Sequence, residues 1–157
     1  MNIFVDEPRS VRSGEELDAA KLATYLKDAL PGLDGVLEVR QFPSGYSNLT
    51  YLVRVGSTEM VLRRPPVGSK VKAAHDMLRE YRVLSALNPV YPKSPKPLAY
   101  CEDAGVLGAP FYVMERIKGV ILRGKRPEGF TCPPELVRQC CDAFVGNLAA
   151  LHGVDYR

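Results

Sequence analysis

Three short segments of this 157-residue sequence carry residue types that could bind a phosphorylated ligand. The first is a turn rich in hydroxyl groups, Ser44-Gly45-Tyr46-Ser47-Asn48, between two segments with strand character. Because glycine lets the backbone approach a ligand closely, the amides and hydroxyls of such a turn can surround phosphate oxygens. The same spacing also fits an ordinary hairpin loop, so both interpretations stay open at this point.

The second segment joins a basic strand end to an acidic helix. Arg63 and Arg64 close a strand-like stretch, and Glu80 lies in the helical stretch that follows. A cation on a strand can reach a phosphate group while a neighbouring carboxylate holds the cation in place. The alternative is that these charges are ordinary solvated surface residues, as most charged side chains are.

The third segment, FYVMERIKG at residues 111–119, is an apolar strand that runs into polar residues and a glycine. Backbone N–H and C=O groups that are left free where a strand leaves its sheet could pair with the edge of a flat heterocycle such as adenine. The alternative is a buried strand that simply leaves the sheet.

Composition excludes several classes of protein. The sequence is 46% hydrophobic, enough for a core, and its formal charge is only +3, with basic and acidic residues mixed along the chain. This argues against a disordered chain and against a nucleic-acid binder. No apolar run is long enough to span a membrane, and residues 1–16 do not resemble a signal peptide. We therefore expect a cytoplasmic protein without membrane or nucleic-acid partners.

Metal and disulfide sites are not expected in this chain. The cysteines form no CxxC pair, and only two histidines could join them in a zinc site. The residues concerned are Cys101, Cys132, Cys140, Cys141, His75 and His152.

Hydrophobic periodicity and turn residues predict the elements that position the three segments. An S-x-x-E capping box at 13–16 precedes an apolar helical pattern at 17–30, with Leu17, Ala20, Ala23, Leu26 and Leu30 on one face. Strands are predicted at 35–42, 50–55, 59–64, 98–103 and 110–117, and a second helix at 70–87. A linker covers 118–131, and Pro133-Pro134-Glu135 begins a last helix.

This order predicts an α+β fold with a five-stranded antiparallel sheet and one packed helix. We expect four parts: an N-terminal helical segment (1–34), the small lobe (35–117), a hinge and linker (118–133) and a separate last helix (134–157). One face of the last helix is strongly apolar, so it needs something to pack on. Its apolar residues are Val137, Cys140, Cys141, Phe144, Leu148 and Leu151.

Taken in order, these segments resemble the small lobe of the protein-kinase-like fold in the aminoglycoside phosphotransferase and choline kinase-like family. The resemblance rests on SGYSNLTYLV (44–53), MVLRRPP (60–66), HDMLREYRVLSAL (75–87) and FYVMERIKG (111–119). It covers nearly the whole chain and is nearest to the branch that includes the kinase-like half fused to some acyl-CoA dehydrogenases.

The resemblance implies an ATP site. Residues of the turn and the strand after it match the phosphate-covering loop: Ser44, Gly45, Ser47, Asn48 and Thr50. Arg63 falls where most kinases carry a lysine, and Glu80 matches the helix acid that pairs with it. Met114, Glu115 and Ile117 match the hinge, where backbone groups would bind adenine. Arginine at position 63 departs from the lysine of the general kinase pattern. Its guanidinium is planar and wider than an ammonium group, so the geometry of its phosphate contacts can differ from that of lysine.

A second departure concerns the catalytic loop and the metal-binding Asp of the family, which should follow the last helix. His152-Gly153-Val154-Asp155 resembles that loop but lies directly at the helix end, where the family carries a similar non-catalytic motif. We therefore expect no catalytic or metal-binding residue within these 157 residues, and a Mg²⁺ site in a missing lobe.

The leading hypothesis is the ATP-binding fragment of a small-molecule kinase that moves the γ-phosphoryl of ATP to a substrate hydroxyl and is inactive alone. The competing hypothesis is a non-catalytic binding or regulatory module that docks a partner through its last helix. A bare α+β domain of unknown role is the third possibility. The uncovered helix would also favour a dimer, and the acceptor substrate is not readable from this sequence.

Overall fold

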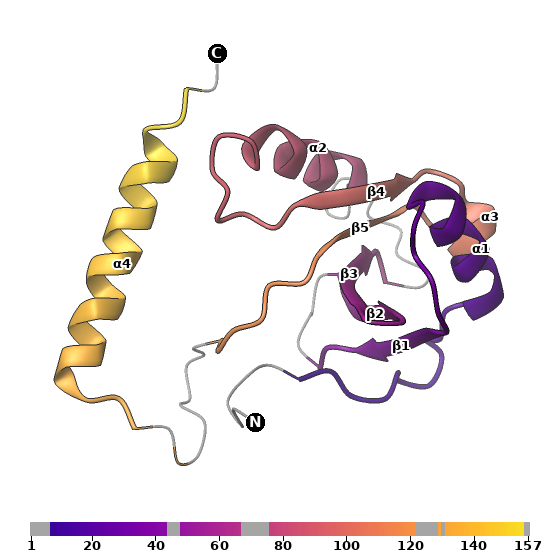
Figure 1. The fold of residues 1–157 in the computed structure, drawn as a ribbon, viewed down its shortest axis with the longest axis horizontal. Helices are drawn as coiled ribbons and strands as arrows, with labels where there is room; N and C mark the ends of the chain where they lie inside the picture. The colour runs from indigo at the N-terminus through magenta and orange to yellow at the C-terminus, as the bar shows by residue number, and fades with distance from the viewer. Residues whose placement is uncertain (1–6, 44–47, 67–75, 122–128, 130, 156–157) are drawn as a thin grey trace.

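The five strands of the chain form one sheet, with helices on both of its faces (Figure 1). The computed structural model describes residues 7–43, 48–66, 76–121, 129 and 131–155. Its elements are α1 (Ala19–Ala29), β1 (Leu37–Gln41), β2 (Leu49–Val55), β3 (Thr58–Arg64), α2 (Met77–Leu87), β4 (Pro97–Cys101), α3 (Ala104–Leu107), β5 (Phe111–Glu115) and α4 (Pro134–His152). The expected α+β fold with a five-stranded antiparallel sheet is confirmed.

The sheet has the strand order β1-β2-β3-β5-β4, and every neighbouring pair is antiparallel. A two-residue turn, Gly56-Ser57, joins β2 to β3 and sets the register in which Val55 opposes Thr58. Gly56 has a φ of +57°, and a Cβ there would lie 2.3 Å from the carbonyl oxygen of Asp34. Only glycine fits such a position, so this residue fixes the hairpin.

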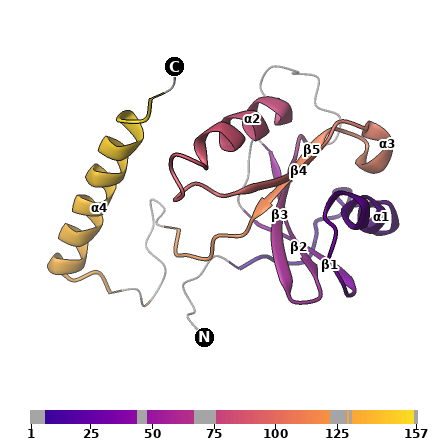
Figure 2. The same ribbon diagram turned by 45° about the horizontal axis from the view of Figure 1, so that its top comes forward.

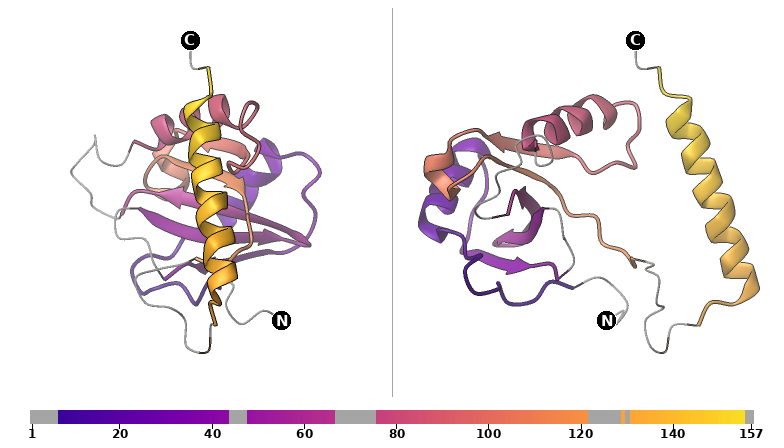
Figure 3. Two further views of the ribbon diagram at one scale, coloured as in Figure 1. Left: turned by 90° about the vertical axis from the view of Figure 1, so that its left-hand side faces the viewer. Right: turned by 180° about the vertical axis from the view of Figure 1, so that it is seen from behind.

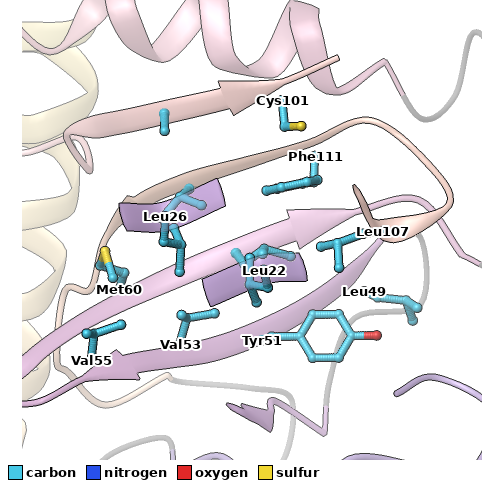
Figure 4. Packing of buried hydrophobic residues seen from close by; sticks show 13 residues of the cluster. Leu22, Leu26, Leu49, Tyr51, Val53, Val55, Met60, Cys101, Leu107 and Phe111 are labelled. Atoms are coloured by element: carbon cyan, nitrogen blue, oxygen red, sulfur yellow. The ribbon is translucent and has the colours of Figure 1, made fainter. Parts of the chain in front are cut away.

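The main core lies between α1 and one face of the sheet (Figure 4). Leu22 and Leu26 of α1 are fully buried and belong to the same cluster as Tyr51, Val53 and Phe111. Because side chains alternate along a strand, the residues between these, such as Leu52, face the other side of the sheet. Figure 2 shows α1 and α2 on opposite sides of the strands.

The predicted start of the first helix is wrong. The N-cap is Asp18, whose carboxylate accepts a hydrogen bond of 3.0 Å from the amide of Lys21. The carboxylate of Glu16 instead accepts one from the amide of Gly14 at 2.8 Å. The buried face is accordingly formed by Leu22 and Leu26, while Ala20 and Ala23, which the sequence pattern placed on it, are exposed.

The segment before α1 closes the open edge of the sheet along β1. Arg9 and Gln41 exchange two backbone hydrogen bonds of 2.8 Å. The buried side chain of Gln41 accepts a hydrogen bond from the amide of Arg12 at 2.9 Å and donates one to Glu15. This last bond is the main reason why the pKa of Glu15 lies below its usual value. Such pairing leaves less of the edge strand open to other chains.

Helix α2 packs on the sheet face opposite α1. Its N-cap is Asp76, which accepts a hydrogen bond of 2.9 Å from the amide of Arg79. The ring of Tyr81 lies 5.6 Å from that of Tyr100 on β4 and 6.4 Å from that of Tyr112 on β5. The predicted first turn of this helix, residues 70–75, lies outside the described residues.

Between β4 and β5 the chain forms the short helix α3, where the sequence pattern indicated only a glycine-containing turn. Asp103, predicted as the end of a strand, is its N-cap and accepts a hydrogen bond of 2.7 Å from the amide of Gly105. A four-residue helix is too short to show a periodic pattern, so its sequence reads as a loop.

Helix α4 lies beside the lobe, and none of its residues is buried (Figure 3). Lys93 reaches it by donating a hydrogen bond to the side chain of Asn147. Its apolar face is exposed: Phe144 retains 67% of its accessible surface. The two cysteines of this helix, Cys140 and Cys141, are also exposed. Among the described residues, no helix is both long and apolar enough to cross a membrane.

Candidate functional site

Three neighbouring strands bring Thr50, Arg63 and Tyr112 into one row across the sheet. Thr50 on β2 lies directly opposite Arg63 on β3, and Arg63 lies directly opposite Tyr112 on β5. Residues paired in this way have their side chains on the same face of a sheet. This row is on the face that α2 covers, away from the main core.

Helix α2 places a carboxylate over this row. The Oε2 atom of Glu80 lies 3.5 Å from Nη1 of Arg63, and both side chains are about one-third exposed, at 29% and 32%. The hydroxyl of Tyr112 donates a hydrogen bond of 2.9 Å to the same oxygen. Nδ2 of Asn48 donates a hydrogen bond of 2.9 Å to Oε1. The structure thus brings together Arg63 and Glu80, which the sequence singled out as a pair, and adds two neutral donors.

Burial explains the state of the donors in this cluster. Tyr112 is only 1% exposed, and its burial raises the pKa of its hydroxyl well above the ordinary value. A tyrosine hydroxyl is protonated at neutral pH even at its ordinary pKa, and this one donates its proton to Glu80 in a hydrogen bond. Nε of Arg63 is buried and has no hydrogen-bond partner in the described part of the chain. Buried polar atoms without partners are uncommon in folded proteins.

A small apolar cluster continues the same face of the sheet beyond the polar row. Phe42, Leu52 and Val61 are buried there, and Met114 packs against them. Leu52 opposes Val61, and Val61 opposes Met114. Of these four residues, only Met114 was singled out by the sequence. Strand alternation was the signal that could have found Leu52 and Val61, because each lies between two residues of the main core.

The chain leaves the sheet after Glu115, where the sequence predicts a hinge. The amide of Glu115 donates a hydrogen bond of 2.8 Å to the carbonyl of Lys96. Two residues later, the amide of Ile117 makes no hydrogen bond with any residue that the structure describes, and its side chain is 56% exposed. Ile117 thus has an N–H group available to a ligand.

The residue between them, Arg116, has a side chain that is only 6% exposed. Its Nη1 donates a hydrogen bond of 3.0 Å to Glu59, and its Nη2 lies 3.6 Å from Glu7. Its guanidinium also lies over the ring of Phe42, 5.9 Å from the centroid. A hydrogen bond from Lys118 is the main cause that holds the pKa of Glu59 below its usual value. These contacts fix the exit of the chain against β3 and the N-terminal segment.

A hollow of about 340 Å³ adjoins the Arg63–Glu80 pair. Its lining residues come from the sheet and from α2: Arg63, Arg79, Glu80, Val83, Leu84 and Tyr112. A second hollow, of about 530 Å³, lies between α1 and α3, lined by Lys21, Tyr25 and Asp103 among others. The first hollow contains the charged residues that the sequence identified.

The structure does not test the remaining residues that the sequence assigned to the phosphate-covering loop. Ser44, Gly45 and Ser47 of the phosphate-covering loop lie outside the described residues. Within the described ranges, no group of three or more His, Cys, Asp or Glu side chains is arranged to hold a metal ion. His152 is the last residue of α4, so the motif that follows it belongs to a helix end.

An antiparallel sheet with a strand cation, a paired acid on one packed helix and an exposed exit strand is the arrangement of the small lobe of a kinase-like phosphotransferase. The comparison with protein families agrees. The model of the phosphotransferase enzyme family matches residues 38–157, so the chain belongs to this family.

Individual relatives support the same assignment. Acyl-CoA dehydrogenase family member 11 of Rattus norvegicus is 39% identical over 144 residues, which cover 89% of this chain and 18% of that protein. Acyl-CoA dehydrogenase family member 10 of Mus musculus is 33% identical over 156 residues, covering 99% of this chain and 14% of that protein. The chain thus spans less than one-fifth of these curated relatives, and the branch named from the sequence is confirmed.

A solved structure shares the fold. The crystal structure described as an aminoglycoside phosphotransferase of Ralstonia eutropha superimposes with a TM-score of 0.70 at 33% identity. The match covers 90% of this chain and 40% of that one.

Proposed function

We propose that this chain is the ATP-binding part of a small-molecule phosphotransferase, which transfers the γ-phosphoryl of ATP to a substrate hydroxyl. One observation carries the proposal. The Arg63–Glu80 pair, with its Tyr112 and Asn48 contacts, lies on the same sheet face as the apolar cluster that ends at the hinge. A phosphate-binding end and an apolar end on one surface fit the two halves of a nucleotide.

The apolar end suits adenine. Phe42, Leu52, Val61 and Met114 form an apolar cluster on this face of the sheet, and small-molecule sites are mostly lined by such side chains. In this arrangement the amide of Ile117 donates to a ring nitrogen of adenine, and the carbonyl of Glu115 accepts from the exocyclic amine. Both groups come from the backbone, so they recognise the base without depending on side-chain identity.

The polar end suits phosphates. Arg63 supplies positive charge and planar donors, and Glu80 holds the guanidinium in place. A guanidinium can bind two phosphate oxygens at once, which an ammonium group cannot do in the same geometry. Asn48 and Thr50 stand at the base of the loop that we expect to cover the phosphates through Ser44, Gly45 and Ser47.

ATP supplies the phosphoryl group, and Mg²⁺ neutralises its phosphate charge when bound. We assign the metal ligands, the catalytic base and the acceptor pocket to residues outside this chain. The described residues contribute binding and orientation, which is most of what a protein supplies in phosphoryl transfer. We therefore expect residues 1–157 to bind nucleotide poorly and to transfer no phosphoryl group alone.

One observation favours a second function. The exposed apolar residues of α4, such as Phe144 and Leu148, would suit a non-catalytic module that docks a partner protein through this helix. Nucleotide would then have no part in the function. Binding measurements separate these alternatives.

The test is nucleotide-dependent thermal stabilisation of the full-length natural protein with ATP and Mg²⁺. Bound ligand raises the melting temperature by an amount that grows with the ratio of the free ligand concentration to the Kd. We expect Arg63→Ala and Glu80→Ala each to weaken ATP binding about tenfold or more, which corresponds to about 1.4 kcal/mol. The matched control is Arg54→Ala, which removes an arginine paired with Glu38 elsewhere on the sheet. Unchanged stabilisation in both site variants would contradict the proposed function and favour the docking module.

A further inference from the structure

We infer that Tyr112 is a positioning residue of this site, whose hydroxyl orients the Glu80 carboxylate so that Glu80 in turn orients Arg63 toward the phosphates. The inference rests on the proposed function and deepens it, because it assigns the orientation of the strand cation to a residue of another strand. Neither the sequence motifs nor the family resemblance assigns a role to this tyrosine.

The geometry gives Glu80 two separate anchors. The Tyr112 hydroxyl donates to Oε2, which is the oxygen that faces Nη1 of Arg63, while Asn48 donates to Oε1. A carboxylate held at both oxygens cannot rotate freely about its last bond. The oxygen that faces Arg63 is therefore held where Tyr112 places it.

The Arg63–Glu80 pair alone would hold its geometry weakly. Its N···O distance is 3.5 Å, and both side chains are partly exposed to water. Pairs of this kind gain little in water because two flexible side chains must be ordered. The hydrogen bonds that Tyr112 and Asn48 donate to the Glu80 carboxylate contribute more than an exposed ion pair of this kind, because the acceptor is charged. These two donors therefore hold Glu80 in place, and Glu80 in turn orients the Arg63 guanidinium.

Tyr112 is itself rigidly placed. It is almost fully buried on β5, directly opposite Arg63, and its ring lies 6.4 Å from the ring of Tyr81 on α2. The ring thus docks α2 against the sheet, while the hydroxyl contacts Glu80. Tyr112→Phe keeps the ring and removes only the hydroxyl, so it separates these two contributions.

If Tyr112 had a purely structural role, loss of its hydroxyl would lower the affinity of every ligand of the site alike. If Tyr112 acts through Glu80 and Arg63, loss of its hydroxyl lowers the affinity only of a ligand that carries phosphates. Comparison of ATP with adenosine therefore distinguishes the two cases, since adenosine uses only the apolar cluster and the hinge.

The experiment measures ATP and adenosine affinity by calorimetry on the full-length protein, in wild type and in Tyr112→Phe. We expect the Kd for ATP to rise three- to tenfold and the Kd for adenosine to stay within twofold. The matched control is Tyr100→Phe on the neighbouring strand. The Tyr100 ring packs on Tyr81, but its hydroxyl makes no hydrogen bond within the described residues. This control should change neither affinity.

A second measurement does not depend on the variant. In wild-type protein with ¹³C-labelled tyrosine, the Tyr112 Cζ resonance should shift when ATP is added and stay in place with adenosine. A resonance that responds to neither ligand, or equally to both, overturns the inference. So does an equal loss of ATP and adenosine affinity in Tyr112→Phe.

Arg63→Ala, measured in parallel, separates the inference from the proposed function. If Arg63→Ala weakens ATP binding while Tyr112→Phe does not, Tyr112 has no positioning role and the proposed function stands. If wild type does not bind ATP, the proposed function fails and the inference fails with it.

Discussion

Arg63 on β3 and Tyr112 on β5 are directly paired across the sheet, and both reach the same oxygen of Glu80 on α2. Two strands and a helix that lie far apart in the sequence therefore meet at one carboxylate atom. This relationship makes the Arg63 guanidinium part of a network that also contains Glu80 and Tyr112.

The first prediction concerns the choice of arginine at position 63. Lysine is the usual residue at this position in kinases, and it would keep the positive charge but lose the planar set of donors. We expect Arg63→Lys to keep ATP affinity within about threefold to fivefold of wild type, while Arg63→Ala loses about tenfold or more. Calorimetry on the full-length protein with ATP and Mg²⁺ measures both. If lysine binds as poorly as alanine, guanidinium geometry rather than charge determines binding.

The second prediction concerns the apolar end of the site. Val61 lies in the centre of the cluster formed with Phe42 and Leu52, and it opposes Met114. A larger side chain there would occupy the surface that we assign to adenine. We expect Val61→Phe to weaken ATP and adenosine binding equally, by about tenfold, which is about 1.4 kcal/mol.

The control for this variant is Val36→Phe, since Val36 is exposed just before β1. It adds the same side chain at a distance from the cluster and should change neither affinity. Unaltered adenosine binding in Val61→Phe would show that the base binds elsewhere.

These assignments differ in how far the sequence could predict them. The hairpin between β2 and β3 was predictable because Gly56-Ser57 is a recognisable turn, and the turn sets the register that places Thr50 opposite Arg63. Tyr112 was not predictable in this way. Its contact with Glu80 depends on β5 pairing with β3 across a long connection, which no local pattern encodes.

The first residue of a helix is also difficult to predict from sequence, as α1 shows. Both the S-x-x-E motif at Ser13 and the side chain of Asp18 satisfy the chemistry of an N-cap, and the structure uses Asp18. Tertiary packing decides between such local alternatives. Here the choice places Leu22 and Leu26 against the sheet, and the hydrogen bond of 2.7 Å from the Tyr51 hydroxyl to the Glu15 carbonyl anchors the segment before the helix.

The third prediction concerns stability at alkaline pH. Burial raises the pKa of Tyr51 from 10.0 to about 12. Because the folded protein holds this proton more tightly than the unfolded chain, the stabilisation is fully present below pH 10 and is lost as the pH rises toward 12. Tyr51→Phe removes this titration together with the hydrogen bond to Glu15. We expect the variant to be about 1 kcal/mol less stable at pH 7.

Urea unfolding at a series of pH values tests this prediction. The difference in unfolding free energy between wild type and Tyr51→Phe should shrink as the pH rises from 10 to 12. Tyr25, whose pKa burial also raises to about 12, remains in both proteins and provides a common background. A difference that stays constant over this range would show that Tyr51 does not titrate between the two states.

The last prediction concerns α4, whose apolar residues Phe144 and Leu148 are exposed at 67% and 42%. An amphipathic helix with an uncovered apolar face tends to pair, because burial of such side chains removes them from water. We propose that isolated residues 1–157 form a dimer through this face at micromolar concentration.

Sedimentation velocity should then show a dimer for the unmodified chain and a monomer for Phe144→Ser combined with Leu148→Ser. Gln139→Ser, an exposed polar position on the same helix, is the control and should remain dimeric. A monomer for the unmodified chain would contradict self-association through α4, since both apolar side chains would then remain in water.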